Sequence, residues 1–163
     1  MAIPIEAETL LAALRRVLDF STASAGVKAA ARRALDAYRP LAPAALPRCA
    51  TCKEIPDECG SLSTSTNPNS LPPPCYRLIP EELVQRSRCW EEVRCESCGA
   101  AYIYHRSYEY LAGGSEDGET FTRLDVAPLL DRVANLLERR PHWSQEFQQT
   151  VDLLERAIRR TPP

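Results

Sequence analysis

The stretch that decides the fold of this chain is Cys49-Ala50-Thr51-Cys52, together with Cys95-Glu96-Ser97-Cys98-Gly99 much later in the sequence. Each Cys-x-x-Cys pair places two thiols on one side of a tight turn, and two such pairs supply the four soft ligands of a tetrahedral zinc ion. Gly99 favours the left-handed backbone that a metal-binding turn needs as the chain enters a strand. The sequence therefore predicts one zinc site, with Cys49, Cys52, Cys95 and Cys98 as ligands.

The predicted zinc site is structural. Four thiolates fill the tetrahedral coordination of zinc and leave no open position for a reactive water molecule. The sequence also shows no legible pairing of a nucleophile with a base. We therefore expect a protein that is not an enzyme and that contains Zn²⁺ as a structural cofactor.

Three further cysteines, Cys59, Cys75 and Cys89, bring the total to seven. An odd number fits metal ligands plus spare thiols better than a framework of paired disulfides. Their irregular spacing favours core or loop thiols. A second metal ion bound by these cysteines with His105 stays an open alternative.

Composition narrows the class of protein. The 163 residues are 44% hydrophobic and 26% charged, which are ordinary globular values, and the formal net charge is −2. The segment 49–124 carries twelve acidic and seven basic side chains, so the cysteine-bearing part is the acidic one. No apolar run is long enough for a transmembrane helix, and early charges interrupt any signal core, so we expect a cytoplasmic protein without membrane contact.

Helical patterns occupy both ends of the chain. Apolar residues recur at helical spacing from about Ile5 to Asp19, and a second stripe follows Ser24 as far as Tyr38. Near the C-terminus, Asp125 is placed to cap one helix and Ser144 to begin the last. The few residues between these last two helices predict an antiparallel helical hairpin.

The segment between the cysteine pairs is less regular. Residues 61–70 are polar and predict a long exposed loop, the prolines of 71–74 predict a stiff extended segment, and a short helix is expected from Pro80. After Gly99, tyrosines alternate with other residues over 101–111, which predicts a strand. We expect a turn over 113–118 and a partner strand over 120–124.

One face of the predicted strand carries four tyrosines. We expect two of them to pack in the core, and the other two are open between core and an exposed patch for a partner. Those four residues are Tyr102, Tyr104, Tyr108 and Tyr110.

The two cysteine pairs followed by a hairpin resemble the zinc-ribbon group over residues 49–124, and the second pair looks like a rubredoxin-type knuckle. The resemblance implies metal binding. The run from Tyr108 to Leu124 is also similar to segments of uncharacterised bacterial zinc-ribbon proteins, which implies a bacterial source and no particular activity.

These patterns predict an α+β fold in which helical pairs from both ends pack together around an inserted four-cysteine zinc ribbon and β-hairpin. The predicted domains are a helical pair with a proline-rich arm over 1–48, the zinc-ribbon module with its long loop over 49–124, and a helical hairpin over 125–163.

An acidic module attracts and complements a basic surface, so the leading functional hypothesis is a protein-binding module with a basic protein partner. Its most specific form is an immunity protein that neutralises a basic toxin. The expected partner-binding residues are Tyr108, Tyr110, Glu116, Asp117 and Glu119.

The alternative hypothesis is a zinc-ribbon regulator that binds nucleic acid. The acidic metal module opposes it, because a basic stripe is the usual footprint of such proteins. A basic face from the helices would have to come from Arg15, Arg16, Arg32 and Arg33.

Overall fold

The computed structural model describes residues 4–19, 25–64, 66–112, 114–139 and 144–160. The chain divides into two compact units. Unit 1 combines Met1–Ala45 with Asp125–Pro163, and unit 2 is the continuous segment Leu46–Leu124. The first and last parts of the chain therefore fold together, and each unit is described by itself below.

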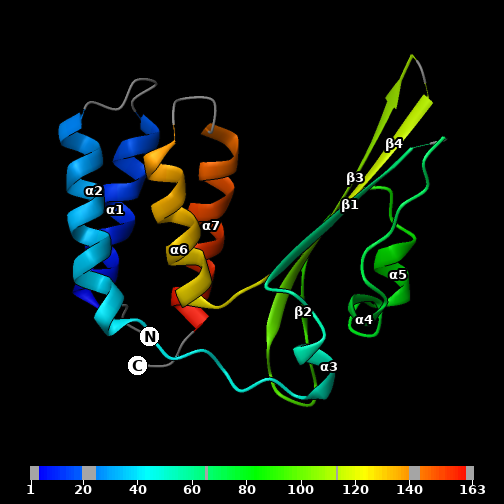
Figure 1. Ribbon diagram of the computed structural model, residues 1–163, viewed down its shortest axis with the longest axis horizontal. Coiled ribbons are helices and arrows are strands. Elements are labelled where there is room, and N and C mark those ends of the chain that lie inside the picture. The colour runs from blue at the N-terminus through cyan, green and yellow to red at the C-terminus, as the bar shows by residue number, and fades with distance from the viewer. Residues whose placement is uncertain (1–3, 20–24, 65, 113, 140–143, 161–163) are drawn as a thin grey trace. The chain divides into compact units, whose positions relative to one another are not determined.

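Unit 1 is helical (Figure 1). Helix α1 contacts α2 and α7, and α6 contacts α2 and α7, so the two helical pairs pack on each other. The bounds are α1 Ile5–Asp19, α2 Ala25–Tyr38, the 3₁₀ turn η1 Arg39–Leu41, α6 Val126–Glu138 and α7 Ser144–Arg160.

Apolar stripes at helical spacing explain this packing. In α1, Leu10 and Leu14 are completely buried, and in α7 Phe147 is as well. Two ion pairs join the helical pairs. Arg15 of α1 pairs with Glu155 of α7, and Arg32 of α2 pairs with Glu138 of α6 at 2.9 Å between Nη2 and Oε1. The helices predicted at both ends of the chain are confirmed.

Unit 2 contains a four-stranded antiparallel sheet with the strand order β1-β4-β3-β2. The central pair, β3 with β4, is the longest, and the two shorter strands flank it (Figure 1). The bounds are β1 Glu58–Thr64, β2 Cys89–Arg94, β3 Ala101–Leu111 and β4 Gly114–Arg123.

Three one-turn helices accompany the sheet: α3 Ala50–Lys53, α4 Pro73–Tyr76 and α5 Glu81–Val84. Figure 1 shows α4 and α5 beside the sheet and α3 near the connection from β2 to β3. The core of unit 2 lies between these helices and one face of the sheet. Its buried members are Cys52, Ile55, Leu71, Cys75, Ile79, Leu83, Val93, Cys95, Ala100, Tyr102, Tyr104 and Phe121.

Strand β3 carries the four tyrosines that alternate along the sequence. Tyr102 and Tyr104 are completely buried, and the Tyr102 ring stacks on Phe121 with 4.6 Å between ring centroids. Tyr110, on the same face but near the end of the strand, is 82% exposed. The expectation that two of the four tyrosines pack in the core is thus confirmed, and of the two left open Tyr108 is half-buried and Tyr110 is exposed.

Two predictions of turns and loops in the middle segment are wrong. The turn expected over 113–118 is strand from Gly114 onward, because β4 begins there and β3 runs to Leu111; residue 113 lies outside the described residues. The polar loop expected over 61–70 begins as strand β1, which pairs with β4 as far as Thr64.

The prolines after Leu71 also differ from expectation. They begin helix α4 instead of an extended segment, since proline is compatible with the first turn of a helix. The short helix expected from Pro80 is present as α5.

The structure confirms the α+β class, with helices and an antiparallel sheet in the described ranges. Among the described helices, none has the length and apolar character needed to cross a membrane.

Candidate metal centre

The first Cys-x-x-Cys pair lies on α3. Cys49 is the N-cap residue and has extended backbone angles, and Cys52 lies one helical turn later and is completely buried. The N–H of Lys53 donates to the carbonyl oxygen of Cys49 at 3.0 Å, which closes this turn. The helical turn brings both thiols to one side of the chain.

The second pair lies in the turn between β2 and β3. The N–H of Cys95 donates to the carbonyl oxygen of Ala100 at 2.8 Å, and the N–H of Gly99 donates to that of Cys95, also at 2.8 Å. Gly99 has φ +73°, the left-handed conformation expected from the sequence. This tight turn is flanked by paired strands, which fix its position in unit 2.

The four sulfur atoms converge. Cys49 Sγ lies 3.6 Å from Cys95 Sγ, and Cys98 Sγ lies 3.5 Å from Cys52 Sγ. All four lie within 4.8 Å of one another. A tetrahedron with Zn–S distances of about 2.3 Å has S···S edges of about 3.8 Å. The arrangement is therefore compatible with one four-coordinate ion.

Backbone N–H groups surround the second pair. Burial, the largest single effect, raises the pKa of Cys95, but the N–H groups of Cys98 and Ser97 together with the thiols of Cys49 and Cys52 outweigh it and lower that pKa. The pKa of Cys98 is likewise lowered against the effect of burial, by the N–H groups of Cys49 and Ala100 and by neighbouring thiols. N–H donors directed at sulfur stabilise thiolates, which are the form that binds a metal ion.

Cys52 differs from its partners. Burial raises the pKa of Cys52, and the neighbouring thiols raise it further. Four thiolates this close repel one another unless a cation lies between them, so ionisation of all four cysteines requires a bound cation such as a divalent metal ion.

Tyr102 is a further polar group beside the cluster. Its hydroxyl is buried and has no hydrogen-bond partner within the described part of the chain, and its interaction with Cys52 lowers the pKa of that thiol, which offsets only part of the rise caused by burial. A hydroxyl in this position is suited to donate to a metal-bound Cys52 thiolate, as outer groups of metal sites do.

The other three cysteines are not part of this cluster. Cys59 Sγ lies 3.5 Å from Cys75 Sγ, whereas the Cys89 thiol points to the carbonyl oxygen of Leu83 at 3.9 Å. His105 packs against Trp90 with 5.0 Å between ring centroids. Within the described ranges, no second group of three or more candidate ligands comes together, so the alternative of a second metal ion gains no support.

The residues predicted to bind a partner separate into two groups. Tyr110 is largely exposed, and Tyr108, Glu116 and Asp117 are half-buried near the same end of the β3–β4 hairpin. Glu119 is only 8% exposed and belongs to the core.

Glu119 is the centre of a buried network that sequence reasoning missed. Its carboxylate accepts hydrogen bonds from the hydroxyls of Tyr76, at 2.7 Å, and Tyr104, at 2.5 Å. The Tyr76 hydroxyl in turn accepts from the N–H of Leu71 at 3.2 Å. Side chains alternate between the two faces of β4, so Glu119 lies on the same face as the core residue Phe121. This alternation is the feature of the sequence from which the burial of Glu119 could have been predicted.

Comparison with protein-family models, with curated proteins and with solved structures finds no match to this chain. The source of the chain and the identity of its partner accordingly stay predictions, and the fold and the metal centre stand on the geometry alone.

Proposed function

We propose that this protein is a non-catalytic binding module that contains a structural zinc ion. The observation that carries the metal assignment is the convergence of four thiols, all within 4.8 Å, from two separate turns of unit 2. Cys49, Cys52, Cys95 and Cys98 would hold the ion, and a bound zinc ion would link α3 to the β2–β3 turn. Four thiolate ligands leave no site for substrate or water, which supports a structural role.

The proposed binding surface is the end of the β3–β4 hairpin. Glu109 and Glu116 are direct partners in the strand register, although like charges directly opposite each other destabilise a sheet. Tyr110, next to Glu109, exposes a large aromatic side chain to solvent. An acidic pair beside an exposed tyrosine is suited to bind a basic protein surface, because the partner would relieve the charge repulsion and cover the ring.

The specific form of this proposal is an immunity protein of a bacterial cytoplasm that neutralises a basic toxin. It is supported by the excess of acidic over basic side chains in segment 49–124, which contains the whole of the proposed surface. A charged surface of this kind mainly accelerates association and selects among partners.

The alternative of a nucleic-acid regulator is weakened by the ion pairs of unit 1. Of the arginines that would form a basic face, Arg15 is paired with Glu155 and Arg32 with Glu138. Phosphate contacts need available cationic side chains, and these two already interact with carboxylates.

The test is affinity capture with the full zinc-loaded chain, followed by binding measurements with each purified captured protein at several salt concentrations. The variant Glu109→Lys/Glu116→Lys should lose binding, and Tyr110→Ser should weaken it. The matched control is Glu81→Lys/Glu82→Lys, which makes the same change of net charge on the exposed part of α5.

Loss of binding only in the hairpin variants, for a partner whose affinity falls with salt, supports the proposal. Equal loss in both double variants would indicate a general charge effect and would contradict the proposed surface. Capture of nucleic acid alone would favour the regulator instead.

A further inference from the structure

Two thiols outside the metal centre face each other in unit 2. Cys59 lies on β1 and Cys75 on α4, and their sulfur atoms are 3.5 Å apart. Cys59 is half-buried and Cys75 is completely buried. Both are free thiols in this structure.

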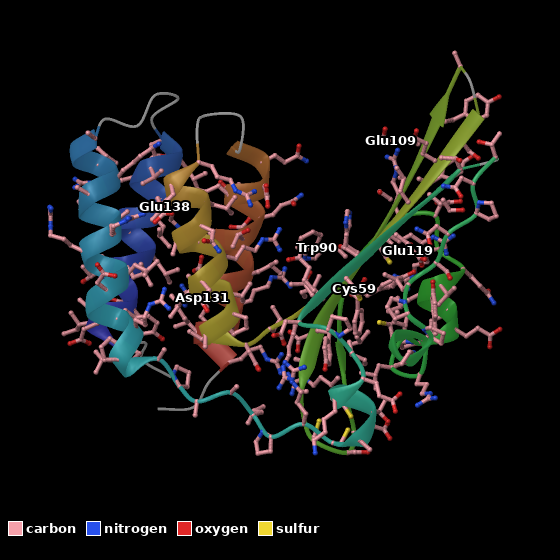
Figure 2. The ribbon with its side chains drawn as sticks, viewed as in Figure 1. Cys59, Trp90, Glu109, Glu119, Asp131 and Glu138 are labelled. Atoms are coloured by element: carbon pink, nitrogen blue, oxygen red, sulfur yellow. The ribbon has the colours of Figure 1, made fainter. Side chains whose placement is uncertain are left out.

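The sheet places Cys59 on the face that α4 covers. Cys59 is the register partner of Phe121, a core residue, and so shares its face of the sheet. Figure 2 shows Cys59 and Glu119 on the side of the sheet toward α4 and α5. A side chain from α4 can therefore reach Cys59 without rearrangement of the strands.

Hydrogen bonds hold α4 in position. Tyr76, the residue after Cys75, donates its hydroxyl proton to Glu119 at 2.7 Å, and this hydroxyl accepts the N–H of Leu71. The hydrogen bonds of Tyr76 therefore hold the single turn of α4 against the sheet. The two sulfur atoms are thus brought together by contacts that do not depend on a bond between them.

We propose that Cys59 and Cys75 are a redox-responsive pair that forms a reversible disulfide by exchange with a low-molecular-weight disulfide, fastening α4 to strand β1. The resulting bond would close the segment between β1 and α4 into a covalent loop, which restricts the unfolded chain.

The exchange proceeds in two balanced steps. The Cys59 thiolate attacks one sulfur of the small disulfide, whose S–S bond breaks, giving a mixed disulfide and one small thiolate that takes up the proton lost by Cys59. The Cys75 thiolate then attacks the Cys59 sulfur and releases the second small thiol, which receives the proton of Cys75. The protein pair is oxidised by two electrons, and the small disulfide is reduced by two.

Cys59 is the first to react because it is the more accessible of the two. Burial raises the pKa of both thiols, to about 12 for Cys75, so thiolates are scarce at neutral pH and the exchange is slow. The equilibrium, measured after long incubation, is accordingly the right readout.

The experiment equilibrates the zinc-loaded full chain with mixtures of reduced and oxidised glutathione, traps free thiols by acid quench and alkylation, and locates disulfides by peptide mass mapping. We expect a Cys59–Cys75 linkage that lacks two hydrogen atoms and disappears on reduction. The variants Cys59→Ser and Cys75→Ser should abolish it, and Cys89→Ser, the matched control, should leave it unchanged.

A second readout is hydrogen exchange in the Cys89→Ser background, where oxidation should slow exchange of the α4 amides and leave α7 unaffected. Three outcomes would overturn the proposal: glutathione retained on Cys59 while Cys75 stays reduced, a linkage of Cys59 to Cys89, or oxidation of the four-cysteine cluster while Cys59 and Cys75 remain reduced.

Discussion

At the scale of single residues, Glu119 shows how a charged side chain comes to lie in a core. Burying a carboxylate is costly unless hydrogen bonds replace its water. Here two tyrosine hydroxyls do so, one from α4 and one from β3, and Arg106 is the register partner of Glu119 on the neighbouring strand. The carboxylate thereby ties α4 to the sheet.

The first prediction concerns one of these hydroxyls. Tyr104→Phe removes the buried donor to Glu119 and should lower the free energy of unfolding by about 1.5–3 kcal/mol, since hydrogen bonds to charged groups contribute about that much. Chemical denaturation of the zinc-loaded chain measures the loss.

Tyr110→Phe is the matched control, because it makes the same change on the same strand face at an exposed position, and it should alter stability by less than about 0.5 kcal/mol. Equal effects of the two substitutions would show that the Glu119 network does not stabilise unit 2.

Some contacts between single residues are predictable from the sequence and others are not. The four clustered cysteines were predictable because their spacing is local and the geometry of each pair is set by one turn. The interaction of Tyr102 with Cys52 and the pairing of Cys59 with Cys75 join distant segments, and no short pattern encodes either contact.

At the scale of elements, the turn that holds the second cysteine pair depends on backbone conformation. Gly99 has φ +73°, and a Cβ added there would meet no atom within 4 Å. Any cost of a side chain at this position is therefore conformational and does not come from a steric clash.

The second prediction follows from this. Gly99→Ala should destabilise the zinc-loaded chain by about 1 kcal/mol or somewhat more, because non-glycine residues are strained in the left-handed region. Gly99→Asn should cost less, since asparagine adopts this conformation more readily. Thermal or chemical denaturation of the two variants gives the ranking, and an alanine variant as stable as the parent chain would refute it.

The wrong predictions of turn and strand positions have physical causes. Gly114 and Gly118 suggested a turn, yet both lie in β4, and a Cβ at Gly118 would come within 2.7 Å of Ser107 Oγ, so this glycine accommodates a close neighbour. Strand β1 was missed because its residues are mostly polar and it is stabilised by pairing with β4 far along the chain. By contrast, the amphipathic helices of unit 1 were predictable from their periodicity alone.

At the scale of the whole molecule, segments that are far apart in the sequence fold into one unit. Unit 1 is built from both ends of the chain, and unit 2 is inserted between them with its own core. Unit 2 also contains all seven cysteines, so both the proposed metal centre and the proposed redox pair act on this unit. Metal binding and thiol exchange should therefore alter the stability of unit 2 while the helices of unit 1 keep their fold.

X-ray absorption at the zinc edge of the zinc-loaded full chain decides whether the four cysteines form a structural zinc centre. We expect four sulfur ligands at about 2.3 Å around one ion per chain. A first shell that contains nitrogen or oxygen ligands, or a folded unit 2 that retains no zinc, would contradict a structural four-cysteine centre.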